Sequence, residues 1–258
     1  MSSRRYSSEE SEMCRMVGVV FRSRFPRESL QALRTVAGTG RIPEETELGH
    51  RDGWGIVAYE AGSPTQIGKS ERPAHVDPSF DSAMDDADSL SPPSILIAHV
   101  RAASAGSVSL RNTHPFISDS LVLAHNGTVR GHIPAGSRTP KGETDSEKLF
   151  MLVADRYERT HDLRESVAGV VKEDLKGTTY NGMVLLVSDG SRLVGFRKVN
   201  HQDWEWYYKL RLAERLTDVM LYQEVPEGCA ADGRVSEVGD GELVTVGLDL
   251  RVAREKLF

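Results

Sequence analysis

Short apolar runs separated by polar, glycine-rich stretches dominate the hydrophobic pattern of this 258-residue chain. Residues 14–21, CRMVGVVF, form a run rich in β-branched residues and too short for a lone helix, which predicts a strand. Residues 62–64, GSP, predict a turn that leads from the run at 53–60 into a hairpin partner, and turn signals such as Asp189-Gly190 separate several later runs. The same pattern predicts further strands over 53–60, 94–100 and 121–127, and over NGMVLLVSDG, SRLVGFRKV, WEWYYKL, DVMLYQEV and ELVTVGLDL.

Longer segments with apolar residues at helical spacing predict helices over 27–38, 144–160 and 162–175. Thr144, followed three residues later by Glu147, is typical of a capping box at the start of the second helix. Residues 73–93 are polar and acidic, and we expect a surface excursion around a short helix there. Many strands, two to four helices and no internal repeat predict one domain.

Composition narrows the class of protein. The apolar fraction of 39% and the charged fraction of 27% are ordinary for a soluble globular chain. A net charge of −6 argues against nucleic acid or an anionic membrane as partner. The sequence has no apolar run long enough to span a membrane and no secretory signal, so we predict a cytoplasmic protein. Only Cys14 and Cys229 are present, which excludes a four-cysteine zinc site.

Polar residues and glycines gather at the ends of the predicted strands, where sites are commonly built. Asn126-Gly127 has two interpretations. It is a common hairpin turn signal, and it also suits an oxyanion hole made of a side-chain amide and a glycine N–H. The two interpretations are compatible.

Two charged residues suggest recognition of an α-amino acid. Arg101 follows an apolar strand, where it could be solvated or paired, or could clamp a carboxylate with Ser104 nearby. Asp145 could be a first-turn acid that favours the helix dipole, or a partner for an ammonium group. An Arg and an Asp held apart would read both charges of an α-amino acid.

Histidines also fall in these clusters, at positions 50, 99, 114 and 125. They form no H-x-x-x-H, H-x-H or H-E-x-x-H pattern, so we predict no metal and no cofactor. A Cys–His dyad stays open at this point.

The clusters, in this order, resemble class II glutamine amidotransferase domains of the N-terminal nucleophile (Ntn) hydrolase superfamily. They are most similar to a small, stand-alone branch that opens Met-Cys-Arg and includes amidohydrolases of glutathione degradation and ergothioneine synthesis. The resemblance covers Met13 to about Phe150, in the stretches MCRMVGVV, HRDGWGIVAY, AHVRAAS, NTHPF, LAHNGTV and ETDSE. It implies an α+β fold, a four-layer αββα sandwich of two mainly antiparallel sheets.

The resemblance also implies residue roles. Cys14 would be the nucleophile, with its own free α-amino group as base, often through a water. Attack on a γ-carboxamide would give a γ-glutamyl thioester, which water hydrolyses. The oxyanion hole would be Asn126 and the Gly127 N–H. The substrate α-carboxylate would lie on Arg101 with Ser104, and the α-ammonium on Asp145.

Such a base requires Cys14 to be the first residue of the mature chain. We predict that residues 1–13 form a disordered leader absent from that chain, and that 14–258 form the amidotransferase domain. Translation could begin at Met13, the leader could be a cleaved propeptide, or it could stay and leave the protein inactive. The predicted function is therefore an amidohydrolase acting on glutamine or a γ-glutamyl small molecule. The alternatives are a glutaminase subunit that feeds ammonia to a synthetase partner chain, and a non-catalytic γ-glutamyl-binding module.

Overall fold

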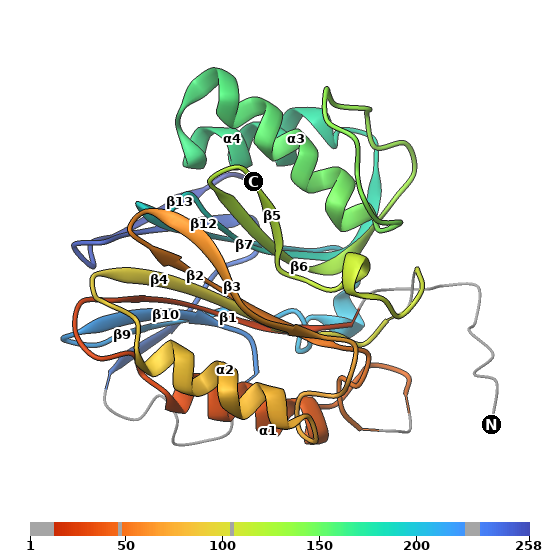
Figure 1. Cartoon of the computed structure of the whole chain (residues 1–258). Coiled ribbons are helices and arrows are strands. Elements are labelled where there is room, and N and C mark those ends of the chain that lie inside the picture. Colours follow the sequence, from red (N-terminus) through yellow and green to blue (C-terminus); the bar gives the residue numbers. More distant parts are fainter. Residues whose placement is uncertain (1–12, 46–47, 104–105, 225–232) are drawn as a thin grey trace.

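A computed structural model describes most of the chain, namely residues 13–45, 48–103, 106–224 and 233–258. Figure 1 shows four layers, with α1 and α2 covering one sheet and α3 and α4 covering the other. This arrangement confirms the predicted α+β sandwich. The predictions for the leader (apart from Met13) and for Ser104 lie outside the described residues, and so does Cys229.

In the part of the chain described, the first sheet has seven antiparallel strands in the order β11-β9-β10-β1-β4-β2-β3. β1 lies at its centre, between β10 and β4. The strands are β1 (Arg15–Phe21), β2 (Trp54–Glu60), β3 (Ser63–Ser70), β4 (Ser94–Val100), β9 (Arg211–Glu214), β10 (Asp218–Tyr222) and β11 (Arg234–Glu237).

The second sheet is also antiparallel, with six strands among the described residues in the order β13-β12-β8-β7-β6-β5. Its strands are β5 (Phe116–Ser118), β6 (Leu121–Arg130), β7 (Thr179–Ser188), β8 (Arg192–Val199), β12 (Glu242–Gly247) and β13 (Val252–Lys256). The sequence pattern did not predict β5, β9, β11 or β13, which are short or lie at sheet edges.

The helices are α1 (Glu28–Thr39), α2 (Pro78–Asp88), α3 (Asp145–Thr160) and α4 (Leu163–Gly169), with helical turns η1 (Leu110–Asn112), η2 (Val170–Asp174) and η3 (Gln202–Trp204). Helix α2 is more than a surface excursion, because its Phe80 and Ala83 are buried in the core beneath the first sheet. At the start of α3, Thr144 Oγ1 accepts from Glu147 N at 3.2 Å. Glu147 turns instead to the backbone N–H groups of Lys141 and Gly142, so only half of a capping box forms.

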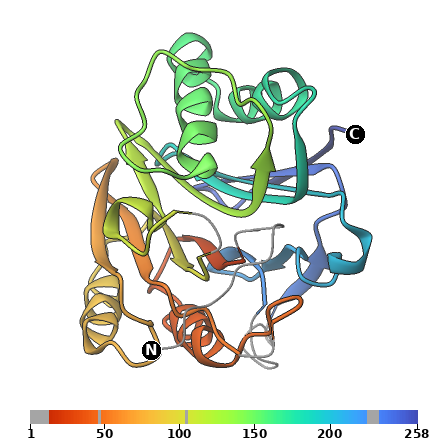
Figure 2. The ribbon, with the colours of Figure 1, turned by 90° about the vertical axis from the view of Figure 1, so that its right-hand side faces the viewer.

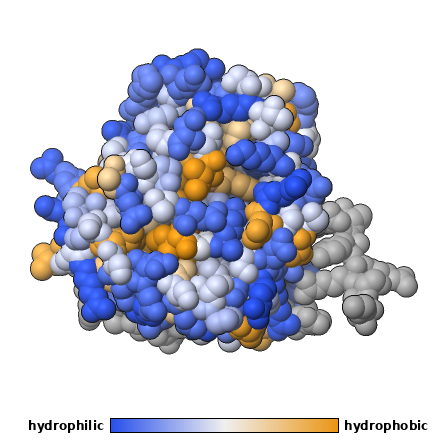
Figure 3. Space-filling model, in the orientation of Figure 1, coloured by the Kyte–Doolittle hydropathy of each residue, from blue (hydrophilic) through white to orange (hydrophobic). Residues whose placement is uncertain are grey.

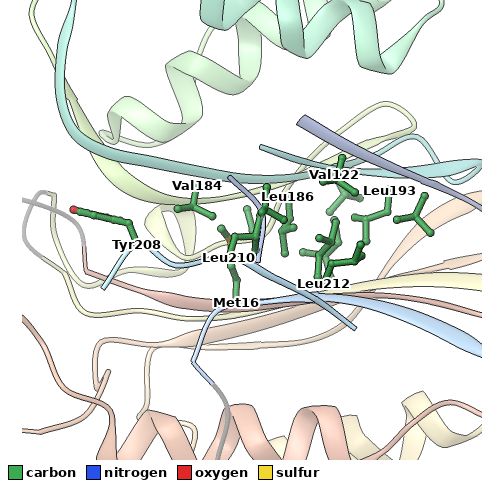
Figure 4. Packing of buried hydrophobic residues seen from close by; sticks show 14 of the residues in the cluster. Met16, Val122, Val184, Leu186, Leu193, Tyr208, Leu210 and Leu212 are labelled. Carbon is green, nitrogen blue, oxygen red and sulfur yellow. The ribbon is translucent and has the colours of Figure 1, made fainter. Parts of the chain in front are cut away.

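The core explains why β1 reads as one continuous apolar run. Val17 and Val19 belong to the cluster that contains residues of α1 and α2, whereas Met16 and Val20 belong to the cluster between the sheets. Figure 4 shows Met16 with Leu186 and other side chains of this inter-sheet cluster. A strand covered on both faces needs no polar alternation.

The segment 204–210 is not the predicted strand. It contains the end of η3 and a following turn, and Trp204, Tyr207 and Tyr208 pack into the inter-sheet core. Aromatic residues satisfy both a strand pattern and a packed turn, so hydrophobicity alone could not separate them.

The outer surface is polar, as expected when the apolar faces of the sheets and helices pack inside. The face in Figure 3 is mostly hydrophilic, with hydrophobic side chains in small, separate areas. Within the described ranges, no helix has the length and apolar character needed to cross a membrane.

Candidate functional site

Cys14 directly precedes β1 of the first sheet and is hydrogen-bonded to β6 of the second sheet. It is fully buried just before β1, and Figure 2 looks onto this end of the sandwich. Its backbone N donates a 3.0 Å hydrogen bond to Asn126 Oδ1 on β6 of the other sheet. Its carbonyl oxygen accepts from Arg15 Nη1 at 3.0 Å and from Tyr207 OH at 3.1 Å. The Cys14 backbone is therefore fixed from both sides.

Hydrogen bonding sets the orientation of the Asn126 side chain. Oδ1 faces the Cys14 N–H, which can only donate, so Nδ2 must be the group that points to Gln223. The Nδ2 to Gln223 Oε1 distance is 3.0 Å. An amide nitrogen carries two hydrogens, and this bond uses one of them.

Gly127 lies inside β6, so the hairpin-turn interpretation of Asn126-Gly127 is wrong. β6 continues to Arg130, with a bulge between Gly127 and Val129. The φ of Gly127 is +142°, and a Cβ there would come within 1.9 Å of Gly182 O. The bulge therefore needs glycine for two independent reasons, backbone conformation and space.

Arg101 and Asp145 are both held in place by backbone groups. Arg101 follows β4 and is fully buried, and its Nη1 donates to Ser107 O at 3.1 Å. A freely solvated Arg101 is therefore excluded. Asp145 is the first residue of α3, as the helix-acid interpretation requires, and its Oδ2 accepts from Val129 N at 2.5 Å. This bond ties the start of α3 to the β6 bulge.

The four clustered histidines are all fully buried. Burial lowers the pKa of each, to about 3 for His99, so they are neutral near pH 7. The His99 and His114 rings lie 4.4 Å apart between centroids, and His125 Nδ1 lies 2.8 Å from Ser146 Oγ. Among the residues that the structure describes, no three His, Cys, Asp or Glu side chains are grouped to hold a metal ion.

The sequence did not identify three residues of this site, Arg15, Tyr207 and Gln223. Arg15 directly follows Cys14 and could have been suspected from that position. Tyr207 was noted only as part of an aromatic run, and Gln223, just after β10, carries no local signal.

Comparison with known proteins places the chain in a family. The family model for class II glutamine amidotransferases matches residues 13–216, starting one residue before Cys14. The chain is 33% identical over 166 residues to a protein of Escherichia coli K12 named "Putative glutamine amidotransferase YafJ", covering 58% of this chain and 62% of that protein. It is 35% identical over 108 residues to glutamine–fructose-6-phosphate aminotransferase of Yersinia pseudotuberculosis, covering 39% of this chain and 17% of that enzyme. The chain thus spans less than two thirds of the length of these curated relatives.

Solved structures share the fold. Glutamine phosphoribosylpyrophosphate amidotransferase of Bacillus subtilis matches with a TM-score of 0.65 and 17% identity, over 95% of this chain and 49% of that one. A glutamine aminotransferase class-II domain protein from Silicibacter pomeroyi matches with a TM-score of 0.60 and 18% identity, over 93% of this chain and 98% of that one. The family match confirms the resemblance and the predicted class of enzyme. The chain belongs to the class II glutamine amidotransferases.

Proposed function

We propose that the chain hydrolyses the γ-amide of glutamine or of a γ-glutamyl compound, with Cys14 Sγ as the nucleophile. One observation carries the proposal: Cys14 N and Asn126 Oδ1 lie 3.0 Å apart. This contact brings the nitrogen that would become the base next to the side chain that would stabilise the oxyanion.

Removal of residues 1–13 supplies the base. In the chain with Met13 attached, Cys14 N is an amide and accepts no proton. Once freed, it becomes an α-amino group, whose ordinary pKa of about 8 suits proton transfer near neutral pH. The hydrogen bond to Asn126 Oδ1 would hold this amine beside its own thiol, where it takes the Sγ proton as the thiol attacks.

The chemical steps then follow in order. Sγ bonds to the γ-carbonyl carbon, and the carbonyl oxygen takes the electron pair and negative charge. The second Nδ2 hydrogen of Asn126 and the N–H of Gly127 stabilise that charge. Collapse expels ammonia or an amine, which takes the proton from the Cys14 α-ammonium. Water then cleaves the γ-glutamyl thioester and restores the thiol.

We assign recognition of the α-amino acid end of the substrate to Arg101 and Asp145, whose side chains are hydrogen-bonded to backbone groups. Arg101 would bind the α-carboxylate, with Ser104 as a second donor, and Asp145 would bind the α-ammonium. The buried Arg101 guanidinium is already ordered, so binding a carboxylate would cost little side-chain entropy.

Ammonia release from glutamine tests the proposal. A chain started at Met13, from which the initiator Met is removed, should release ammonia without any partner protein. The full-length chain and the Met13-started Cys14→Ala variant should not. Ammonia release at the parent rate by Cys14→Ala would refute the nucleophile. Glutamine binding without turnover would indicate a binding module, and turnover only with an added synthetase would indicate a glutaminase subunit.

A further inference from the structure

A pocket of about 240 Å³ opens beside the Cys14 carbonyl. Arg15 and Tyr207, which both donate to that carbonyl, line it, and so does Gln223, which accepts from Asn126. Residues that hydrogen-bond to Cys14 or Asn126 therefore line the pocket, although Cys14 and Asn126 themselves do not. A single water molecule needs only about 10–15 Å³ of such volume, so the pocket is far larger than one molecule of that size requires.

Gln223 lines this pocket and carries a buried donor. Its Oε1 is committed to Asn126 Nδ2, and that orientation is fixed by the chain of bonds that begins at the Cys14 N–H. The other end, Gln223 Nε2, is buried and has no hydrogen-bond partner among the described residues. A buried amide without a partner is costly, which indicates that a ligand atom with a lone pair belongs there.

The charge of the pocket is strongly positive. Four cationic side chains and one carboxylate line it, although the whole chain carries a net charge of −6. Arg15 is paired with Glu224 at 2.7 Å, and Lys209 with Glu237 at 3.2 Å. For Arg41 and Arg211, the described part of the chain supplies no ion pair. Arg41 stacks over the Trp206 ring, with its guanidinium carbon 5.2 Å from the centroid.

We propose that this pocket binds an anionic group, a carboxylate, on the amine portion of the scissile amide. Arg211 and Arg41 would supply the charge and Gln223 Nε2 a further hydrogen bond. Arg101 and Asp145 are outside the pocket lining and hold the opposite, α-amino acid end in the proposed function, on which this inference rests. The preferred substrates are therefore γ-glutamyl amides of amino acids or peptides, rather than glutamine.

The test compares two substrates of nearly equal size. γ-Glutamylglycine carries a carboxylate on its amine portion, and γ-glutamylglycinamide carries a neutral amide at the same place. We expect the Met13-started chain to show kcat/KM roughly tenfold or more higher for γ-glutamylglycine. Arg211→Gln should remove most of that preference, and Arg41→Gln serves as a second variant should the first fail to fold. Arg159→Gln, an exposed site on α3 with the same charge change, should keep the preference.

The possible failures are distinguishable. Hydrolysis of both γ-glutamyl amides at equal kcat/KM, unaltered in Arg211→Gln, would overturn this inference and leave the proposed function intact. A higher kcat/KM for the neutral amide would also overturn it. Hydrolysis of neither γ-glutamyl amide nor glutamine would overturn both proposals together.

Discussion

Asn126 lies between His125, its neighbour in the chain, and Gln223, its hydrogen-bond partner, and the polar side chains on these two sides differ in the charge that they carry. On one side, His99, His114 and His125 are fully buried and neutral, because burial lowers their pKa values. On the other, the pocket next to Gln223 is lined by guanidinium groups that stay charged at any ordinary pH. A neutral, packed cluster suits support of the backbone, whereas an open, permanently charged pocket suits recognition of an anion. The two regions should therefore respond to different variables, pH for the first and salt for the second.

Asn126 belongs to the proposed reaction centre and donates to Gln223 of the pocket, so its loss should have the largest effect. Asn126→Ala in the Met13-started chain should lower kcat for glutamine about 10²–10³-fold, because a preorganised oxyanion donor is lost. Asn126→Asp keeps an acceptor for Cys14 N and loses the donor, so it should be equally slow. Steady-state kinetics would check this. A kcat near the parent value in Asn126→Asp would show that the Nδ2 hydrogens do not stabilise the oxyanion.

The β6 bulge directly follows Asn126 and should be the most sensitive backbone position. We expect Gly127→Ala to lower the free energy of unfolding by at least about 3 kcal/mol, since it combines an unfavourable φ with a clash against Gly182 O. Gly177→Ala is the matched control, because its φ is +89° but a Cβ there meets nothing within 4 Å. It should cost only about 1–2 kcal/mol. Equal losses in urea unfolding would show that φ alone, without the clash, explains the need for glycine.

Lowering the pH should reduce the stability of the protein through its buried histidines. His99 has a pKa of about 3 when folded and about 6.5 when unfolded, so the unfolded chain binds the proton more readily. Stability should therefore be level above about pH 7 and should fall as the pH drops from about 6.5. Between about pH 7.5 and about pH 5.5, His99 alone should account for a loss of about 1.4 kcal/mol.

Urea unfolding at these two pH values would measure the loss. It should shrink in His99→Leu and persist in His132→Gln, a substitution at an exposed loop position. An unchanged pH dependence in His99→Leu would contradict the neutral, buried state of this side chain.

Salt should weaken the substrate preference that the pocket causes, and this is the smallest of the expected effects. Raising ionic strength from about 50 mM to about 500 mM should lower the preference for γ-glutamylglycine over γ-glutamylglycinamide a few-fold, because salt screens the pocket cations. Hydrolysis of glutamine, which has no anionic group on its amide nitrogen, should change little. A preference that is constant across this salt range would mean that charge does not cause it.

The family resemblance predicted the layers, and the hydrophobic pattern predicted most of the strands, better than either predicted the contacts between them. Cys14 and Asp145 stand at the ends of regular elements, and Asn126-Gly127 interrupts an apolar strand, so local pattern could single them out. Gln223 could not be found in this way, because its role depends on β10 lying beside β1 and thus facing Asn126 across the two sheets. The histidine cluster was visible in the sequence, but its neutral state follows from burial, which only the packed structure shows.

The hydrogen bond between Cys14 N and Asn126 Oδ1 supports Cys14 as the nucleophile, and one measurement tests this assignment directly. The Met13-started chain is incubated with a diazo-ketone analogue of glutamine, which loses N₂ as a thiolate bonds to its carbon, and its intact mass is recorded. We predict loss of Met13 and a single adduct that peptide mapping places on Cys14, with no adduct in Cys14→Ala or in the full-length chain. An adduct on any other residue would contradict the assignment of Cys14 as the nucleophile. Full hydrolysis of glutamine by a chain already labelled on Cys14 would contradict it as well.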